Sequence, residues 1–262
     1  MPELPEVESR LVYLRATALG QIIDKVIVSE PRIIKAPSPA QFVRTLKHRL
    51  LVGAIRRGKY LVITLDDGRA LVMHFTMGGS LHYYDSAQEA PRFTRIEFFL
   101  ESGNRLAFTC PRNICRVMLV DSIDEIKGLR EMGPEPLDAN FTLPAFKQRV
   151  LGGKSAKIKV VLMDQRSIAG VGNIYADEIL FQAELRPDRS ASSLSDEEIR
   201  RLYRSVRNVL KKSLKTADDE EFPPTFLIGL DSRGAGCYRC DSKIERTRIG
   251  GRTTRFCPHC QN

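Results

Sequence analysis

YLVITLDDGRALVMHF, residues 60–75, contains two apolar runs separated by the turn-forming pair Asp67-Gly68. Short runs rich in Val, Ile and Leu on both sides of an Asp-Gly turn predict a β-hairpin. Similar runs with similar turn signals extend from about Lys25 to Val120, and they are KVIVS, RIEFFL, RLAFT and RVMLV. We therefore expect an antiparallel β-sandwich or barrel over this part of the chain.

A helix is predicted ahead of these strands. Val7, Leu11, Leu14 and Ala18 follow one another at helical spacing, and Pro5 stands where a helix commonly begins. We therefore expect a helix that starts near residue 5.

The pattern changes after the Gly-Pro-Glu-Pro stretch at residues 133–136, which we interpret as a linker. Ser195 and Glu198 have the spacing of a capping box in front of a further helix, IRRLYRSVRNVLKKSL. The segment after about residue 237 is too short for an apolar core and needs another source of stability. Helical character is also predicted for LPAFKQRVL, KIKVVLMDQ and NIYADEILFQAEL.

Four cysteines form two CxxC pairs, Cys237 with Cys240 and Cys257 with Cys260, with 16 residues between the pairs. This spacing is typical of a zinc ribbon, in which four thiolates hold one Zn²⁺ and metal binding stabilises a short segment. Two redox or disulfide pairs are the alternative interpretation. His259 lies inside the second pair and is not expected to be a ligand, because four thiolates already complete the tetrahedron.

Cys110 and Cys115 remain outside this pattern. They flank the sequence PRNI at a turn. The simplest interpretation is that they are free thiols in a reducing compartment, and a redox role stays open.

The charge of the chain favours a polyanionic partner. There are 41 Lys and Arg against 32 Asp and Glu, which gives a formal net charge of +9. Between the CxxC pairs, four arginines lie in or near a Gly-Gly turn, where they would suit phosphates or form a solvated face. No apolar run is long enough for a membrane helix, and the N-terminus MPELPEVESR does not resemble a signal peptide. We expect a soluble protein of the cytoplasm.

Pro2 is a candidate nucleophile. Removal of Met1 would leave a secondary α-amine, and α-amines titrate about 2 to 3 pH units below lysine. Attack of this amine on a sugar C1′ would form an iminium ion, which acidifies the C2′ proton and permits strand elimination. Glu3 and Glu6 are close enough in sequence to handle the protons. A plain helix start is the alternative interpretation.

Five segments together resemble the formamidopyrimidine-DNA glycosylase/endonuclease VIII family. They are MPELPEVE at the N-terminus, GKYLVITL around Lys59, MHFTMGG around His74, MDQRSIAGVGNIYADEIL at 163–180 and the closing zinc ribbon. The match is colinear over nearly the whole chain, and the start PELPEVE is more similar to the formamidopyrimidine-DNA glycosylase branch.

The resemblance implies an α+β fold with an N-terminal helix and an antiparallel β-sandwich. The expected domains are a catalytic β-sandwich domain at 1–131, a helix–two-turn–helix DNA-binding domain at 132–230 and a zinc-ribbon finger at 231–262. The Zn²⁺ is then structural and distant from the covalent chemistry.

The same resemblance implies catalytic roles near the N-terminus. Pro2 is the Schiff-base nucleophile, Glu3 is the general acid that protonates the sugar ring oxygen, and Glu6 supports them. Lys59 matches the family's lysine that contacts the phosphate beside the lesion.

Further residues are implied to bind DNA. His74 and Met77 match the family's HxxM motif, in which the methionine helps fill the space left by the flipped nucleotide. Asn173 is expected to cap a helix whose amides face a phosphate, and Lys159 to add a phosphate contact. Arg252 matches the zinc-finger arginine that grips the phosphates flanking the lesion, and we prefer it to Arg255 for this role.

Two segments depart from the family pattern. The usual loop Asp-Pro-Arg-Arg-Phe-Gly is here residues 110–115, CPRNIC, in which Arg112 is kept for the orphaned base and Ile114 replaces the aromatic wedge. The segment EEFPPTFLIGLDSRGAG, residues 220–236, is shorter than usual and lacks the loop that caps a flipped 8-oxoguanine. The choice of lesion and of opposite base is therefore expected to differ.

We expect a base-excision-repair DNA glycosylase/AP lyase that removes oxidised bases and cleaves the strand by β,δ-elimination. Formamidopyrimidines, hydantoins and oxidised pyrimidines are the expected lesions, with weak activity on 8-oxoguanine. The expected partner is damaged double-stranded DNA, bound by a monomer associated with the nucleoid. The alternatives are a non-catalytic zinc-ribbon protein that binds damaged or abasic DNA, and a zinc-ribbon transcription or translation factor, which would leave the N-terminal motif without a use.

Overall fold

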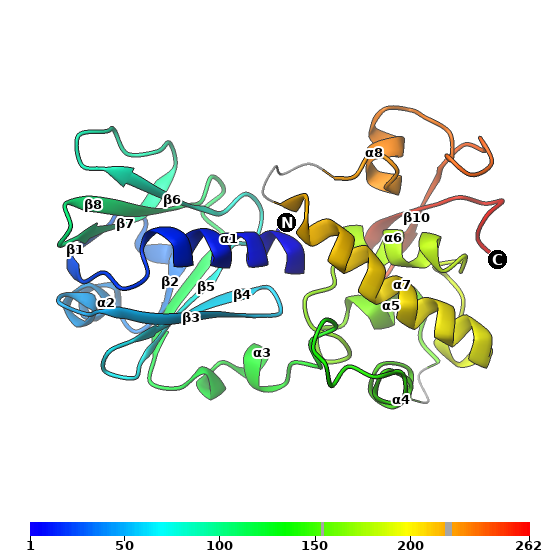
Figure 1. Ribbon diagram of the computed structural model, residues 1–262, viewed down its shortest axis with the longest axis horizontal. Helices are drawn as coiled ribbons and strands as arrows, with labels where there is room; N and C mark the ends of the chain where they lie inside the picture. The colour runs from blue at the N-terminus through cyan, green and yellow to red at the C-terminus, as the bar shows by residue number, and fades with distance from the viewer. Residues whose placement is uncertain (153–154, 218–221) are drawn as a thin grey trace. The chain divides into compact units, whose positions relative to one another are not determined.

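The computed structural model of the protein describes residues 1–152, 155–217 and 222–262 (Figure 1). Contacts divide the chain into two compact units, Met1–Pro2 with Glu6–Arg130 and Glu3–Pro5 with Glu131–Asn262. The predicted domain boundaries after residues 131 and 230 stay a prediction. Among the described residues, no helix has the length and apolar character needed to span a membrane.

The first unit contains a β-sandwich. One sheet has the strand order β1-β7-β8-β6 and the other β2-β9-β5-β4-β3, and every pair is antiparallel except β2 with β9. The strands are β1 Ile23–Val28, β2 Ile34–Ala36, β3 Leu51–Arg57, β4 Tyr60–Leu65, β5 Ala70–His74, β6 Ser80–Asp85, β7 Thr94–Leu100, β8 Asn104–Thr109 and β9 Arg116–Val120.

The predicted hairpin is formed by β4 and β5. The backbone N–H of Leu65 donates to the carbonyl of Arg69, and Gly68 has a positive φ of 85° in the turn. Apolar side chains of both sheets meet in one buried core, for example Phe98 of β7 with Leu61 of β4 in the same cluster. The expected antiparallel sandwich is confirmed.

Helix α1, Leu4–Thr17, supplies the predicted apolar face to this core. Val7, Leu11, Leu14 and Ala18 are at most 3% exposed. The remaining helices of this unit are α2 Pro39–Leu46 and α3 Lys127–Arg130, with 3₁₀ turns at Pro31–Ile33 and Ile123–Glu125.

The second unit is organised around helix α6, Asn173–Gln182. All side chains from Tyr175 to Phe181 are buried, because other helices and the C-terminal hairpin surround it. Ser195 and Glu198 form the predicted capping box of α7. The other elements are α4 Leu143–Phe146, a π-helical turn Lys147–Leu151, α5 Ile158–Met163, a 3₁₀ turn Ala191–Ser193, α7 Asp196–Leu214, α8 Leu227–Ser232, β10 Glu245–Ile249 and β11 Arg252–Phe256.

Residues 133–136 were expected to form a linker, and this expectation is wrong. The N–H of Gly133 donates to the carbonyl of Gln165 at 2.8 Å, and the carbonyl of Pro134 accepts from Ala169 at 3.0 Å. A Cβ atom at position 133 would lie 2.7 Å from the carbonyl carbon of Ser167. The stretch is therefore a packed part of the second unit, and its glycine permits a close backbone approach.

Candidate functional site

The Glu3 carboxylate lies at the N-terminal end of α6. Its oxygens accept from the backbone N–H groups of Gly172 at 2.5 Å, Ile174 at 3.0 Å and Tyr175 at 3.4 Å, and the residue is 2% exposed. The first N–H groups of a helix have no partner within the helix and carry partial positive charge, so a carboxylate stabilises them. Leu4 continues this attachment, because its N–H donates to the carbonyl of Gly170 at 3.0 Å.

Asn173 does not cap this helix, contrary to our prediction. The capping position is Gly172, which has no side-chain acceptor, and the Glu3 carboxylate supplies one from a distant part of the sequence. The side-chain Nδ2 of Asn173 instead donates to the carbonyl of Thr253 at 3.0 Å. Asn173 therefore attaches α6 to the C-terminal hairpin.

Lys159 is fully buried, whereas we expected it to contact a phosphate. Its Nζ lies 2.7 Å from Oδ1 of Asp177 and donates to Thr254 Oγ1 at 2.8 Å. Burial raises the pKa of Asp177 to about 6, and the lysine opposes this shift; burial also lowers the pKa of Lys159. Since Asp177 also accepts from the N–H of Arg255 at 3.0 Å, the ion pair joins α5, α6 and β11.

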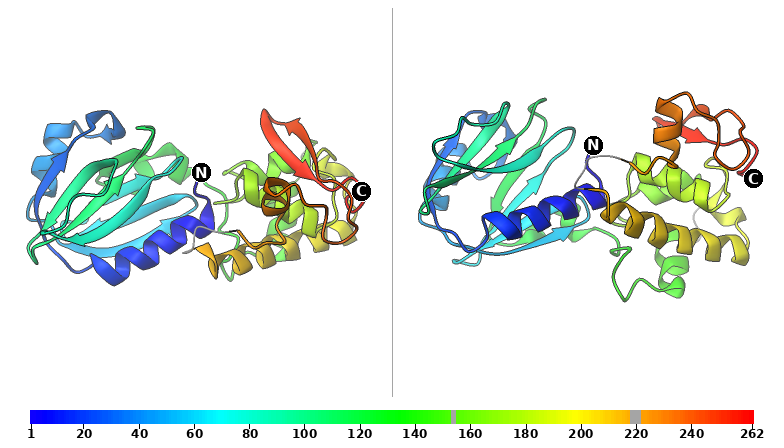
Figure 2. Two further views of the ribbon diagram at one scale, coloured as in Figure 1. Left: turned by 90° about the horizontal axis from the view of Figure 1, so that it is seen from above. Right: turned by 45° about the horizontal axis from the view of Figure 1, so that its top comes forward.

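The β10–β11 hairpin lies beside helix α8 (Figure 2). Asp231 of α8 binds both Arg255 and Arg246, the latter at 2.8 Å. Arg252 is exposed at the start of β11, next to the turn of the hairpin. Arg252 is exposed, whereas Arg255 is partly buried and bound to Asp231; the preference for Arg252 as the phosphate contact stays a prediction.

The four sulfur atoms of Cys237, Cys240, Cys257 and Cys260 all lie within 4.8 Å of one another. Three of the separations are 3.4, 3.5 and 3.8 Å. Thiolates at tetrahedral positions around one Zn²⁺ would be about 3.8 Å apart, whereas bonded sulfurs lie at about 2.05 Å. The residues therefore fit one structural zinc ion. His259 is exposed and outside the cluster, as expected.

In the first unit, Lys59 lies in the turn between β3 and β4 and is 7% exposed. His74 ends β5, and its ring centroid is 4.7 Å from that of Tyr60. Burial, as the largest cause, and the charges of Lys59 and Arg116 together lower the pKa of His74 to about 4. The imidazole is therefore neutral at neutral pH.

Two loops meet next to β5. Met77 is 41% exposed, and Nη1 of Arg112 donates to its sulfur atom at 3.3 Å. Ile114 is 46% exposed in the same loop as Arg112. The structure thus brings together the side chains of Met77 and Arg112, which were chosen separately from the sequence.

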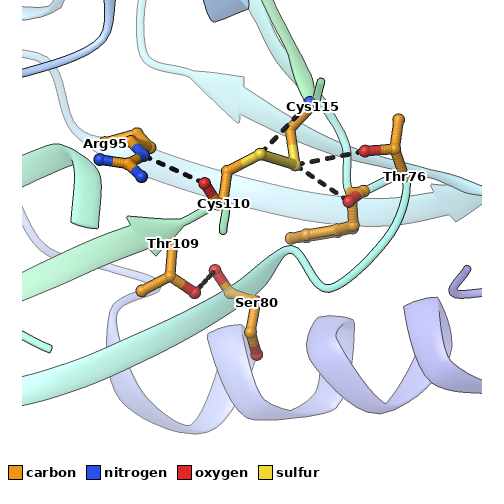
Figure 3. Close-up of a disulfide and its surroundings, with 7 residues drawn as sticks. Thr76, Ser80, Arg95, Thr109, Cys110 and Cys115 are labelled. Atoms are coloured by element: carbon orange, nitrogen blue, oxygen red, sulfur yellow. Dashed lines mark hydrogen bonds between the residues drawn. A yellow bond between two sulfur atoms is a disulfide. The ribbon is translucent and has the colours of Figure 1, made fainter. Parts of the chain in front are cut away.

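Cys110 and Cys115 form a disulfide, so the expectation of two free thiols is wrong (Figure 3). Their Cα atoms are 6.2 Å apart, within the range that a disulfide spans. Both residues are fully buried. The bond closes the loop that carries Arg112 and Ile114.

Pro2 and Glu6 lie at the start of the first unit. Pro2 is half-buried two residues before the start of α1, and Met1 precedes it in this chain, so its nitrogen is an amide here. Glu6 stands in the first turn of α1, where its carbonyl accepts from Arg10 Nη1 at 2.7 Å. The candidate residues form two groups: the first unit holds Pro2, Glu6, Lys59, His74, Met77 and Arg112, and the second holds Glu3, Lys159, Asn173, Arg252 and the zinc cysteines.

We did not predict the roles of Asp177 and Asp231 from the sequence. Asp177 stands beside Glu178 within the otherwise apolar run NIYADEIL, and two acids in such a run are a signal of buried, paired carboxylates. Asp231 has no comparable signal, because its role depends on two arginines of the distant hairpin.

Family profiles match three successive parts of the chain. The formamidopyrimidine-DNA glycosylase N-terminal domain matches residues 1–117, the formamidopyrimidine-DNA glycosylase H2TH domain matches 132–221, and the zinc finger found in FPG and IleRS matches 237–262. The formamidopyrimidine-DNA glycosylase of Pelotomaculum thermopropionicum is 38% identical over 274 residues, covering 100% of this chain and 99% of the relative. That of Moorella thermoacetica is 39% identical, covering 99% and 92%.

The chain belongs to the formamidopyrimidine-DNA glycosylase family. Solved structures agree: the Lactococcus lactis Fpg in complex with DNA containing an abasic site has a TM-score of 0.88 and 26% identity, covering 99% of both chains. MutM in complex with DNA containing carbocyclic 8-oxo-G has a TM-score of 0.86 and 28% identity, covering 100% of both. The chain is thus a DNA glycosylase that acts on damaged DNA, and the predicted fold class and structural zinc are confirmed.

Proposed function

We propose that this DNA glycosylase is also an AP lyase and that the amine of Pro2, after removal of Met1, is its nucleophile. The observation that carries the proposal is the attachment of the next residue. Glu3 is bound by three amides at the N-terminal end of α6, and the N–H of Leu4 donates to the carbonyl of Gly170, so the chain directly after Pro2 is fixed. A fixed nucleophile needs less ordering to reach the geometry of attack.

In the first step, the lone pair of the neutral Pro2 nitrogen forms a bond to C1′ of the damaged nucleotide. The bond from C1′ to the base breaks, and the base leaves with the bonding electrons and takes up a proton. Opening of the sugar ring then requires a proton on O4′. We assign this proton transfer to Glu3, and Glu6 has a supporting role.

The resulting iminium ion draws electrons from C2′ and makes its proton acidic. Loss of this proton expels the 3′-phosphate, and a second elimination expels the 5′-phosphate. The product is a one-nucleotide gap, as expected for β,δ-elimination. Hydrolysis then releases Pro2 from the sugar fragment.

For DNA binding we assign phosphate contacts to Lys59 and Arg252. Within the second unit, Asn173 Nδ2 and the Nζ of the buried Lys159 both donate to the carbonyl of Thr253, next to Arg252, and so hold the hairpin. Such contacts predict a steep loss of affinity as salt rises, because bound phosphates release counterions. An affinity that stays constant from low to physiological salt would contradict these assignments.

Met77 is assigned to the space left by the flipped nucleotide and Arg112 to the orphaned base, and His74 is a neutral group at the end of β5. Their contact at 3.3 Å supports a joint role. Ile114 fills space without the stacking of an aromatic ring, so the preference for the opposite base is expected to be weak.

We assign formamidopyrimidines, hydantoins and oxidised pyrimidines as substrates, with slow removal of 8-oxoguanine. The segment between α7 and Cys237 contains helix α8, and its residues 218–221 lie outside the described residues. Single-turnover rates on matched duplexes test this assignment. Equal rates on 8-oxoguanine and formamidopyrimidine would contradict it.

Borohydride trapping tests the nucleophile. The Met1-cleaved protein should form a covalent adduct with an abasic duplex, and a protein with one additional N-terminal residue should not. An Asp24→Ala protein is the control, since Asp24 is exposed on β1. Trapping by the extended protein would exclude Pro2 as the nucleophile. If both proteins bind the duplex but neither is trapped nor cuts it, a non-catalytic DNA-binding protein would be favoured.

We also propose that the enzyme is a monomer and associates with chromosomal DNA in the cytoplasm. Sedimentation of the free protein and of its complex with a single-site duplex tests whether the enzyme is a monomer. One protein per duplex is expected.

A further inference from the structure

The Cys110–Cys115 disulfide contacts both of the loops assigned to the flipped-out space (Figure 3). The Cys115 sulfur lies 3.0 Å from the carbonyl oxygen of Phe75 and 3.4 Å from the hydroxyl of Thr76, just ahead of Met77. The loop that the disulfide closes carries Arg112. One covalent bond therefore contacts the loop that carries Met77 and closes the loop that carries Arg112.

There is little free space around this bond. A Cβ atom at Gly79 would lie 2.9 Å from the Cys115 sulfur, and one at Gly78 would lie 3.5 Å from Cγ of Pro111. If the bond is broken, the two sulfurs can no longer remain at bonding distance. Because the surroundings are close-packed, a displaced sulfur must shift the loop of residues 75–79 or its own loop.

The loop 110–115 has few other attachments among the contacts described. Cys110 is held at the start of the loop, because its N–H donates to the carbonyl of Phe93 and its own carbonyl accepts from Arg95 Nε, both at 3.0 Å. Within the loop, the N–H of Asn113 donates to the carbonyl of Cys110 at 3.4 Å. Pro111, Arg112 and Ile114 are exposed, and Asn113 has a positive φ of 55°. The conformation that presents Arg112 thus depends strongly on the covalent closure.

The location of the bond is also unusual for a DNA repair enzyme. Compartments that hold DNA commonly keep thiols reduced, and disulfides found there are usually catalytic or redox-sensing. The assigned mechanism uses neither sulfur. Because this disulfide contacts both loops assigned to DNA recognition, its reduction is suited to control DNA binding.

We propose that Cys110 and Cys115 form a redox site, reduced by a dithiol, that controls recognition of damaged DNA. The oxidised pair holds Arg112 and Met77 in place for the orphaned base, and the reduced pair releases them. This inference rests on the roles proposed above for these two side chains.

The dithiol supplies the electrons and protons that reduce the disulfide. One thiolate of the reductant attacks a sulfur of the pair, and the other cysteine leaves as a thiolate and takes up a proton. The second thiol of the reductant then attacks the mixed disulfide and releases the remaining cysteine. The protein gains two electrons and two protons, and the reductant becomes a disulfide. Since both sulfurs are fully buried, the loop must open before attack.

The experiment uses the full-length, zinc-loaded protein in mixtures of reduced and oxidised dithiothreitol. Alkylation and peptide mass analysis give the redox state of the 110–115 peptide separately from the zinc cysteines. Fluorescence anisotropy then gives the affinity for a duplex with a tetrahydrofuran site opposite each of the four bases, and for an undamaged duplex.

The oxidised protein should bind the tetrahydrofuran duplex about fivefold to tenfold more tightly, because two side chains are ordered before binding. It should also discriminate among opposite bases more strongly, while affinity for undamaged DNA stays the same. A Cys110→Ser/Cys115→Ser protein should behave as the reduced form in every mixture, and a thermal melt shows that it is folded.

Equal affinity and equal discrimination in the two redox states would overturn the proposal. So would two alkylatable thiols in every mixture. Failure of the Pro2 mechanism is distinguishable, because borohydride trapping would then be absent in both redox states while the redox dependence of binding persists.

Discussion

Glu3 should stabilise the second unit independently of any role in catalysis. In a Glu3→Ala protein, the N–H groups of Gly172 and Tyr175 lose their carboxylate acceptor in buried surroundings. A buried donor without a partner costs about 1–3 kcal/mol, and loss of a helix cap typically costs about 1 kcal/mol. We expect a total loss of about 3 kcal/mol, allowing for partial access of water. Glu3→Gln keeps one acceptor oxygen and should cost about 1–2 kcal/mol.

Urea unfolding followed by far-ultraviolet circular dichroism measures this loss, since the chain has no Trp for fluorescence. Hydrogen exchange of the Ile174 and Tyr175 amides should accelerate in the same variants. Asp24→Ala removes an exposed carboxylate and should stay within about 0.5 kcal/mol of the parent. If Glu3→Ala is as stable as this control and exchange at α6 is unchanged, the attachment of Glu3 does not contribute to stability.

Three further predictions concern other parts of the molecule. The pKa of His74 is about 4 in the folded protein against 6.5 in its ordinary state, so the stability it contributes is present above pH 6.5 and lost as the pH falls to 4. His74→Gln should reduce this acid sensitivity by up to about 3 kcal/mol, measured as unfolding free energy at both pH values. Lys159→Met should cost about 3–5 kcal/mol by leaving the buried Asp177 without its partner, whereas Lys159→Met/Asp177→Leu should recover most of this loss. Equal urea midpoints for the two variants would contradict the ion pair. Cys240→Ser should lose its zinc and its affinity for DNA while the β-sandwich remains folded, and retention of one zinc per chain would exclude the four-cysteine site.

Local features of the fold were predictable because each depends on residues close in sequence. The β4–β5 hairpin follows from two apolar runs and Asp67-Gly68, and the α7 cap follows from Ser195 and Glu198. The zinc cysteines are separated by a longer segment, but CxxC pairs have few other uses at this spacing.

The contacts that were missed join distant residues. Glu3 and Gly172 are 169 positions apart, so the local pattern made Asn173 the better candidate for a helix cap. Lys159 looked like a surface residue, because its partner Asp177 and the acceptor Thr254 belong to other elements. For Cys110 and Cys115, a separation of five residues allows thiols or a disulfide, and the ends of β8 and β9 decide between them.

The hydrogen bonds of the last residues affect how the protein can be labelled. The N–H of Asn262 donates to the carbonyl of Glu184, and Gln261 Nε2 donates to the carbonyl of Leu185 at 2.8 Å. A purification tag fused after Asn262 would disturb these bonds beside the zinc site, and a tag before Pro2 would block the amine. The exposed residues 86–90, between β6 and β7, are a better place to insert an epitope or a dye.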